Sequence, residues 1–264
     1  MKWMLACLLL LPLKARGAAW TQGAGQWQVI GSAISSDAQH GYDGQGRAVT
    51  PKLFQRMLLQ TDMAYGWNDE LTLLLRTETA YARIRDNDGP LVTAVDNAFE
   101  AGARYRLVRG LGLLADDDVL SLEATARMAG AFNFAVSSNA AAAGQDGGIR
   151  LLYGAGFQAF ARDGFVNAEL GHRWVSHPRP NQTPIDLTVG LWLSPDWMAM
   201  AQSFNLISGT ARLPYQQFRI HKMQFSAVWK LSPNFSVQSG LFFSPAGRNA
   251  LDERGLVVSL WAAF

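Results

Sequence analysis

The chain has 264 residues, of which 23 are basic and 21 acidic, and it contains one cysteine. Lys2, Lys14 and Arg16 precede every acidic residue, so the remainder carries 20 basic residues against 21 acidic ones. This balance gives no support to nucleic-acid binding, and no later apolar run reaches the roughly 18 residues of a membrane-spanning helix.

Residues 1–19 have the pattern of a secretory signal peptide. Lys2 is followed by an apolar core of about ten residues, Met4 to Leu13, too short to cross a bilayer as a helix. Small residues around Ala18 then offer a cleavage site, so the mature domain is expected to cover residues 20–264. Cys7 lies inside the signal, so the mature protein is expected to lack disulfides and Cys-ligated metals.

Alternation of apolar and polar residues predicts about twelve antiparallel strands, each near the length that crosses a bilayer at a tilt. The expected strands are 24–36, 52–65, 70–83, 95–107, 118–129, 148–160, 164–176, 184–194, 196–206, 217–231, 234–244 and 255–264. Most connections alternate between tight turns and longer polar stretches. The longer stretches are Ser36–Pro51, Arg85–Ala94, Gly130–Gly147 and Ser244–Arg254. The pattern predicts an all-β transmembrane barrel with short periplasmic turns and longer extracellular loops.

A soluble β-sandwich or lipocalin-like barrel would also show alternating strands, but its loops need not alternate in length. Aromatic residues expected to form an interfacial girdle gather at the short-turn end. They are Tyr65, Trp67, Tyr105, Phe165, Trp197, Trp229, Phe235 and Phe264. The strand 196–206 is ambiguous, because its Trp197 and Met198 faces compete for the lipid side.

Charged residues at mid-strand are expected to face the lumen, since Arg or Lys facing lipid at the bilayer midplane costs about 2–4 kcal/mol. The residues expected to line the lumen are Arg56, Arg76, Glu78, Glu100, Arg104, Arg106, Glu123, Arg127, Arg150, Glu169, Arg173 and Lys222, joined by Asp62, Asp96, Asp186 and Lys230. Hairpin geometry predicts three opposed pairs. These are Arg56 with Glu78, Arg104 with Glu123, and Glu100 with Arg127. The charges either brace a filled barrel or line a polar route for solutes.

Catalytic chemistry has weak candidates only. His172, Ser176, His177 and Asn181 cluster near one strand end, but neighbouring Ser176 and His177 would point to opposite faces. His172 and His177 would face apart as metal ligands, and Asp116–Asp118 lacks the spaced ligands of a calcium loop. We therefore expect no catalytic residue, no metal and no cofactor.

The final strand alternates and ends on Phe264, which resembles the closing strand of bacterial outer-membrane barrels. In that family the terminal Phe belongs to the signal read by the barrel assembly machinery. The segments Ala19–Gln22, Ala201–Asn205 and Ala246–Gly255 resemble a group of uncharacterised proteobacterial outer-membrane barrels. That group is loosely similar to transporters associated with aromatic-compound degradation. The resemblance implies an outer-membrane channel and names no substrate.

The sequence thus predicts a porin-like channel in the outer membrane of a Gram-negative bacterium, passing small polar or amphipathic solutes. Two alternatives stay open. One is a non-conducting barrel that serves as a scaffold in an export or surface complex, and the other is an outer-membrane lipid hydrolase. Expected partners are the lipid bilayer with lipopolysaccharide, the assembly machinery and, for the scaffold, a surface protein; nucleic acid is not among them.

Overall fold

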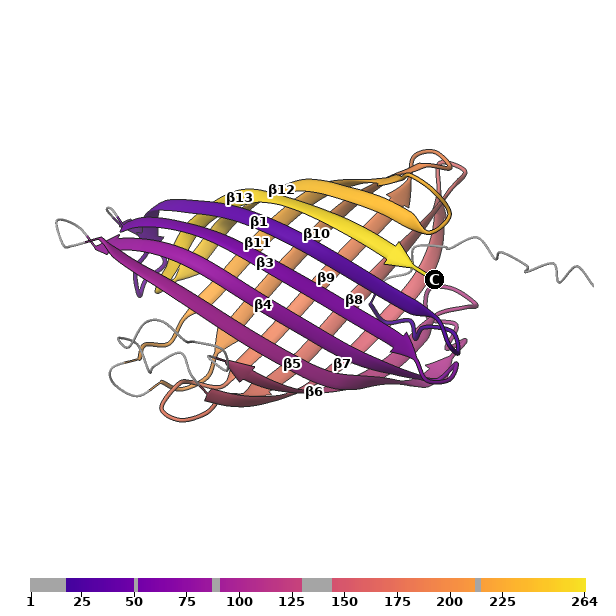
Figure 1. Cartoon of the computed structure of the whole chain (residues 1–264), viewed down its shortest axis with the longest axis horizontal. Helices are drawn as coiled ribbons and strands as arrows, with labels where there is room; N and C mark the ends of the chain where they lie inside the picture. Colours follow the sequence, from indigo (N-terminus) through magenta and orange to yellow (C-terminus); the bar gives the residue numbers. More distant parts are fainter. Residues whose placement is uncertain (1–17, 50–51, 87–90, 130–143, 212–214) are drawn as a thin grey trace, which may run out of the picture.

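The chain forms a closed antiparallel β-barrel (Figure 1). A computed structural model describes residues 18–49, 52–86, 91–129, 144–211 and 215–264. Twelve strands pair in sequence order, and β13 closes the sheet by pairing with β1 from Gln28↔Ala263 to Tyr42↔Ala250. A short extra strand, β2, adds to the end of β1. Among the described residues no helix is long and apolar enough to cross a membrane.

The strands match the twelve expected from the sequence, with β2 as the addition. Their bounds are β1 Trp27–Tyr42, β2 Ala48–Val49, β3 Lys52–Gly66, β4 Leu71–Asp86, β5 Val92–Arg109, β6 Val119–Ala129, β7 Gly144–Ala159, β8 Arg162–Trp174, β9 Gln182–Trp192, β10 Trp197–Ser208, β11 Arg219–Lys230, β12 Phe235–Arg248 and β13 Ala250–Ala263.

One end of the barrel has short turns, and we call it the short-turn end. A side chain caps three of its turns by accepting two backbone N–H groups. Asn68 accepts from Glu70 and Leu71. Ser194 and Ser232 act in the same way at the β9–β10 and β11–β12 turns. Such local hydrogen bonds favour turns over continued strand, so these residues end the ladders.

At the opposite, long-loop end, several expected loops are strand. Residues 244–254 were expected to be a loop, but β12 runs to Arg248 and β13 begins at Ala250, leaving only Asn249 between them, with φ of 45°. Similarly, β1 continues to Tyr42. In these stretches polar residues occur on both faces, so the apolar–polar alternation stops while the hydrogen-bonded ladder continues. A prediction based on alternation alone therefore ends these strands too early. Most of the expected loop 130–147 lies outside the described residues.

The two faces of the wall differ as alternation predicts. On β10, Trp197 is 45% exposed and stacks on Trp229 at 5.6 Å between ring centroids, whereas Met198 and Met200 are buried. This assigns the ambiguous strand, with Trp197 facing outward. Phe165 corrects an expectation: it is buried inside the barrel and does not join the outer girdle.

Candidate functional site in the barrel lumen

The segment before β1 turns into the barrel at its short-turn end and is held there by inner-wall side chains. Ala19 is fully buried and donates its N–H to Asn167 Oδ1 at 2.7 Å, while its carbonyl accepts from Ser121 Oγ at 2.6 Å. The carbonyl of Trp20 accepts from Arg104 at 3.3 Å. These partners come from β5, β6 and β8, so the segment crosses the inner face of three strands.

Trp20 completes an apolar cluster that spans the lumen at this end. Its ring meets Phe165 edge-on, with centroids 6.4 Å apart. The buried members are Ala19, Trp20, Val119, Leu152, Phe165, Met198, Met200 and Val228, and Trp192 and Trp261 pack against them. The strand members come from β6, β7, β8, β10 and β11, with one tryptophan each from β9 and β13 against them. The cluster therefore places hydrocarbon inside the barrel at this end, where an open channel would hold water.

Next to this cluster, Arg104 and Glu123 form a nearly buried ion pair. Two guanidinium nitrogens of Arg104 donate to Glu123 Oε2, at 2.7 and 3.1 Å. The two residues lie directly opposite each other on β5 and β6, as predicted. Two-point donation fixes the Arg side chain and aims its third nitrogen at the carbonyl of Trp20. Arg106 reaches the same segment, with 3.5 Å between Nη1 and Thr21 Oγ1.

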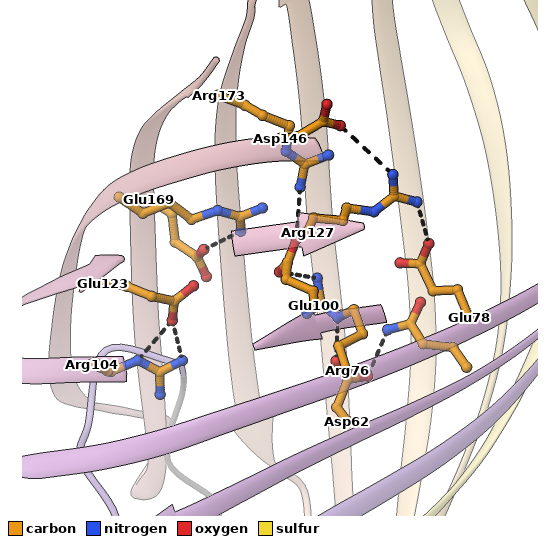
Figure 2. A network of polar contacts seen from close by, with 12 residues as sticks. Asp62, Arg76, Glu78, Glu100, Arg104, Glu123, Arg127, Asp146, Glu169 and Arg173 are labelled. Carbon is orange, nitrogen blue, oxygen red and sulfur yellow. Dashed lines mark hydrogen bonds and ion pairs between the residues drawn. The ribbon is translucent and has the colours of Figure 1, made fainter. Parts of the chain in front are cut away.

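A chain of charges then crosses the middle of the lumen (Figure 2). Arg76 lies 2.5 Å from Asp62 and 3.6 Å from Glu100, and Glu100 lies 3.4 Å from Arg173. Glu100 is on β5 and Arg173 on β8, with two strands between them. Side chains so far apart around the wall can meet only across the concave inner side, which places this chain in the lumen.

Arg127 links this region to the long-loop end. It lies 3.0 Å from Glu78 and 3.9 Å from Asp146, which also binds Arg179 at 2.8 Å. The predicted register of Glu100 opposite Arg127 is present, but no ion pair joins them among the described residues. Glu100 pairs instead with Arg76, which lies directly opposite it on β4. Arg127 lies opposite its partner Asp146 on β7 and also reaches Glu78 on β4.

Glu253 organises the opposite wall. Its carboxylate binds Arg56 at 2.9 Å, Ser36 Oγ at 2.6 Å and the Lys222 ammonium. The predicted pairing of Arg56 with Glu78 is therefore wrong, because Arg56 lies opposite Ala82. Glu253, Asp146 and Arg179 all lie in stretches that the sequence predicted to be loops. Continuing the alternation of the last expected strand back from residue 255 would have placed Glu253 on the lumen face.

A hollow of about 280 Å³ lies within this charged region. Its wall includes Arg150, Arg173, Asp186 and Lys222 on the polar side. Arg150 is bound to Glu169 at 3.1 Å, whereas Asp186 has no ion pair among the described residues. Phe204, Leu206 and Ile220 supply an apolar side. The hollow could therefore hold a small molecule with both polar and apolar parts.

Within the acidic run at residues 116–118, Asp118 has a structural role in the connection between β5 and β6. Asp118 is fully buried and accepts hydrogen bonds from the N–H groups of Gly112 and Leu113 and from the Tyr153 hydroxyl. Burial raises the pKa of Asp118, but these hydrogen bonds outweigh burial and hold its pKa below the ordinary 3.8. The Asp118 carboxylate thus holds the β5–β6 connection in place through these three hydrogen bonds.

The candidate hydrolase residues do not assemble a triad. Ser176 Oγ lies 3.4 Å from Asp146 and 3.1 Å from Arg179, and no described His donates to it or accepts from it. A different Ser–His contact, missed in the sequence, joins Ser203 to His221 at 3.3 Å. No described residue binds the other ring nitrogen of His221, so the orienting third group of a hydrolase is missing there. The described residues hold no group of three potential metal ligands.

No family model matches the chain, and no curated protein matches its sequence. Its structure does resemble solved bacterial outer-membrane barrels. The COG4313 outer membrane channel from Pseudomonas putida F1 aligns with a TM-score of 0.69 at 15% identity, over 94% of this chain and 98% of that one. The KdgM porin with disordered oligogalacturonate gives 0.50 at 10% identity, over 90% and 99%. The transport unit of the autotransporter AIDA-I from Escherichia coli gives 0.50 at 8% identity, over 98% and 94%. The chain therefore has the fold of these barrels, which include a channel, a porin and the transport unit of an autotransporter.

Proposed function

We propose that this protein is an outer-membrane channel that passes small polar or amphipathic solutes, as the porin-like neighbours suggest at the level of the fold. The observation that carries the proposal is the lumen hollow, whose wall combines Lys222, Arg173 and Asp186 with Phe204 and Ile220. A barrel that served only as a rigid body would be expected to fill this space with packed side chains. The ion pairs on its wall also keep polar groups available to a passing solute.

The apolar cluster around Trp20 lies in the path that a solute would take through the barrel. It occupies the short-turn end, so a solute leaving the hollow toward that end must displace the segment at Ala19–Trp20 or move past it. Ala19 and Trp20 are held by two backbone hydrogen bonds at Ala19, one at Trp20 and the packing of a single indole ring. The next residues, Thr21 and Gln22, are also bonded to the wall, so they anchor the segment on its other side. We therefore describe the resting barrel as closed at one end, with the segment as its closure.

The same cluster favours the second candidate, a non-conducting scaffold. A lumen filled with hydrocarbon has no continuous water, and such a barrel would act through its long-loop end. Under this alternative, deleting residues 130–143 from the expected loop would remove a protein partner and leave permeability unchanged. The hydrolase alternative has no assembled site at Ser176, as described above.

Single-channel recording separates the two candidates. The mature protein, refolded and shown to be folded by heat-modifiable gel migration, would be inserted in a planar bilayer under a salt gradient. A channel gives discrete openings, and Arg127→Glu shifts its reversal potential toward cation selectivity, because the change adds negative charge beside Glu78 and Asp146. Folded protein that stays silent, with or without Trp20→Ala, would support the scaffold and contradict the channel.

A further inference from the structure

A polar patch lies on the outer surface of β10, β11 and β12 near the long-loop end. It consists of Ser203, Asn205, Arg219, His221 and Arg248. These residues alternate along their strands with residues whose side chains face the lumen, such as Phe204 and Lys222. Ser203 Oγ lies 3.3 Å from His221 Nε2 and also accepts a hydrogen bond from the Asn205 amide at 3.1 Å.

The same outer face becomes apolar toward the middle of the barrel. Phe225 of β11 and Phe243 of β12 are exposed and stack at 6.4 Å between centroids. Phe225 lies four residues beyond His221 on β11, so both point outward. Along this face the surface therefore changes from aromatic to strongly polar, as the surroundings of a barrel change from acyl chains to lipid headgroups.

Arg219 and Arg248 lie directly opposite each other in the β11–β12 ladder, and both are exposed. Like charges at facing positions destabilise a sheet unless something neutralises them. The lumen arginines Arg56, Arg104 and Arg127 each bind a carboxylate. By contrast, no described carboxylate lies within ion-pair distance of Arg219 or Arg248. An anion from outside the chain would neutralise the two facing arginines.

A hollow of about 670 Å³ adjoins the two arginines. Its lining includes His221 and Asn205 from the patch, Ile207 on the same face of β10 as Asn205, and the glycine-rich turn 44–46. This turn keeps its own charges paired, because Asp43 binds Arg47 at 2.9 Å. The hollow thus offers two guanidinium groups to an anion and apolar contacts to whatever carries that anion.

We propose that Arg219 and Arg248, with His221 beside them, bind a phosphate group of lipopolysaccharide in the outer leaflet. Guanidinium groups match phosphate oxygens with two parallel hydrogen bonds, and one phosphate between two arginines removes their repulsion. The acyl chains of the same lipid would run along Phe225 and Phe243. The proposal depends on the outer-membrane location and is independent of whether the barrel conducts.

The test compares three forms of the protein extracted from outer membranes in mild detergent, with bound lipopolysaccharide counted by native mass spectrometry. The forms are wild type, Arg219→Ala/Arg248→Ala and Arg83→Ala/Arg85→Ala. The last is a matched control, because Arg83 and Arg85 are exposed on the outer face of β4 but lie opposite Gln55 and Leu53. Titration of each form with core-only lipopolysaccharide follows, and inorganic phosphate is tested separately to separate the lipid from a free anion.

Wild type and the control should retain the lipid, and the Arg219/Arg248 double variant should bind it at least about tenfold more weakly. The single variants Arg219→Gln and Arg248→Gln guard against misfolding, since each relieves the like-charge opposition; each should bind several-fold more weakly. Folded variants that keep wild-type affinity would overturn the proposal. Binding of inorganic phosphate that depends on these arginines, without binding of lipopolysaccharide, would also overturn it in favour of a soluble anion.

Discussion

The indole ring of Trp20 lies against the backbone of Gly154, so that a Cβ atom at position 154 would come 2.6 Å from ring carbon Cζ3. Only a glycine leaves room for the ring there. Gly154→Val should therefore push Trp20 off its seat and raise the permeability of the barrel. Single-channel current, or uptake of small solutes into liposomes, measures this change. Gly147→Ala is the matched control on the same strand, because its Cβ meets nothing within 4 Å; an equal effect of both variants would refute this explanation.

The Arg104–Glu123 pair should be a large contributor to stability. Both side chains are about nine-tenths buried, so Arg104→Ala leaves an unpaired buried carboxylate and should cost about 3–5 kcal/mol of unfolding free energy. Urea unfolding in micelles, followed by tryptophan fluorescence, gives this value. The rim pair Arg254–Asp37 is well exposed, and Arg254→Ala should cost less than about 1 kcal/mol. Equal losses at the two pairs would contradict the assignment of Arg104 as a buried strut.

The β5–β6 connection should loosen in acid because of Asp118. Its folded-state pKa is lowered, so its stabilising contribution is complete above the ordinary pKa of 3.8 and is lost as the pH falls through the lower folded value. The protection of residues 110–118 from hydrogen exchange, taken relative to the intrinsic rate at each pH, should therefore fall at low pH in wild type. In Asp118→Asn exchange should be fast already at pH 7, whereas exposed Asp116→Asn should behave as wild type. Hydrogen-exchange protection of the wild-type connection that persists well below pH 3.8 would agree with the lowered pKa of Asp118. Loss of this protection above pH 3.8 would contradict it.

Signal removal should leave Ala19 on the mature protein. Ala19 is fully buried and uses both its N–H and its carbonyl inside the barrel. Ala15 and Gly17 supply small residues at the −3 and −1 positions of a cut before Ala18, which keeps these contacts. The intact mass of protein taken from outer membranes should correspond to a chain that starts at Ala18 or Ala19. A chain starting at Trp20, the boundary expected from the sequence, would show that the Ala19 contacts are dispensable.

Strand number and order, and the facing of every strand except β10, were predictable from the sequence because they follow from a short-range pattern. Alternation with a period of two requires only neighbouring residues, and it placed every expected barrel strand. The opposed residues Arg104 and Glu123 could also be predicted, since the register across a hairpin follows from its turn. Phe165 could have been predicted too, because it lies four residues before Glu169 on the same strand and so shares its lumen face.

The lumen contacts were harder to predict for a physical reason. Glu253 binds Lys222 of β11 and Arg56 of β3, and neither strand is its neighbour in the sheet. Such contacts depend on barrel diameter and on side-chain reach, which alternation does not encode. The place of Trp20 was hidden for a similar reason, since its segment precedes the first strand and gives no periodic signal.

In the proposed channel, solutes pass through the lumen hollow once the segment at Trp20 moves aside. Cys7, the only cysteine, lies in the expected signal, so the mature chain allows single-cysteine labelling. Thr188 faces the lumen, where Gln202 donates to it, and adjacent Leu187 is exposed on the outer face. The most direct measurement is the unitary current of Thr188→Cys and Leu187→Cys, each in a Trp20→Ala background, before and after a negatively charged thiol reagent. The channel account predicts that modification lowers the current and shifts selectivity at Thr188→Cys only. Labelled Thr188→Cys with unchanged current, or folded protein without current, would contradict it.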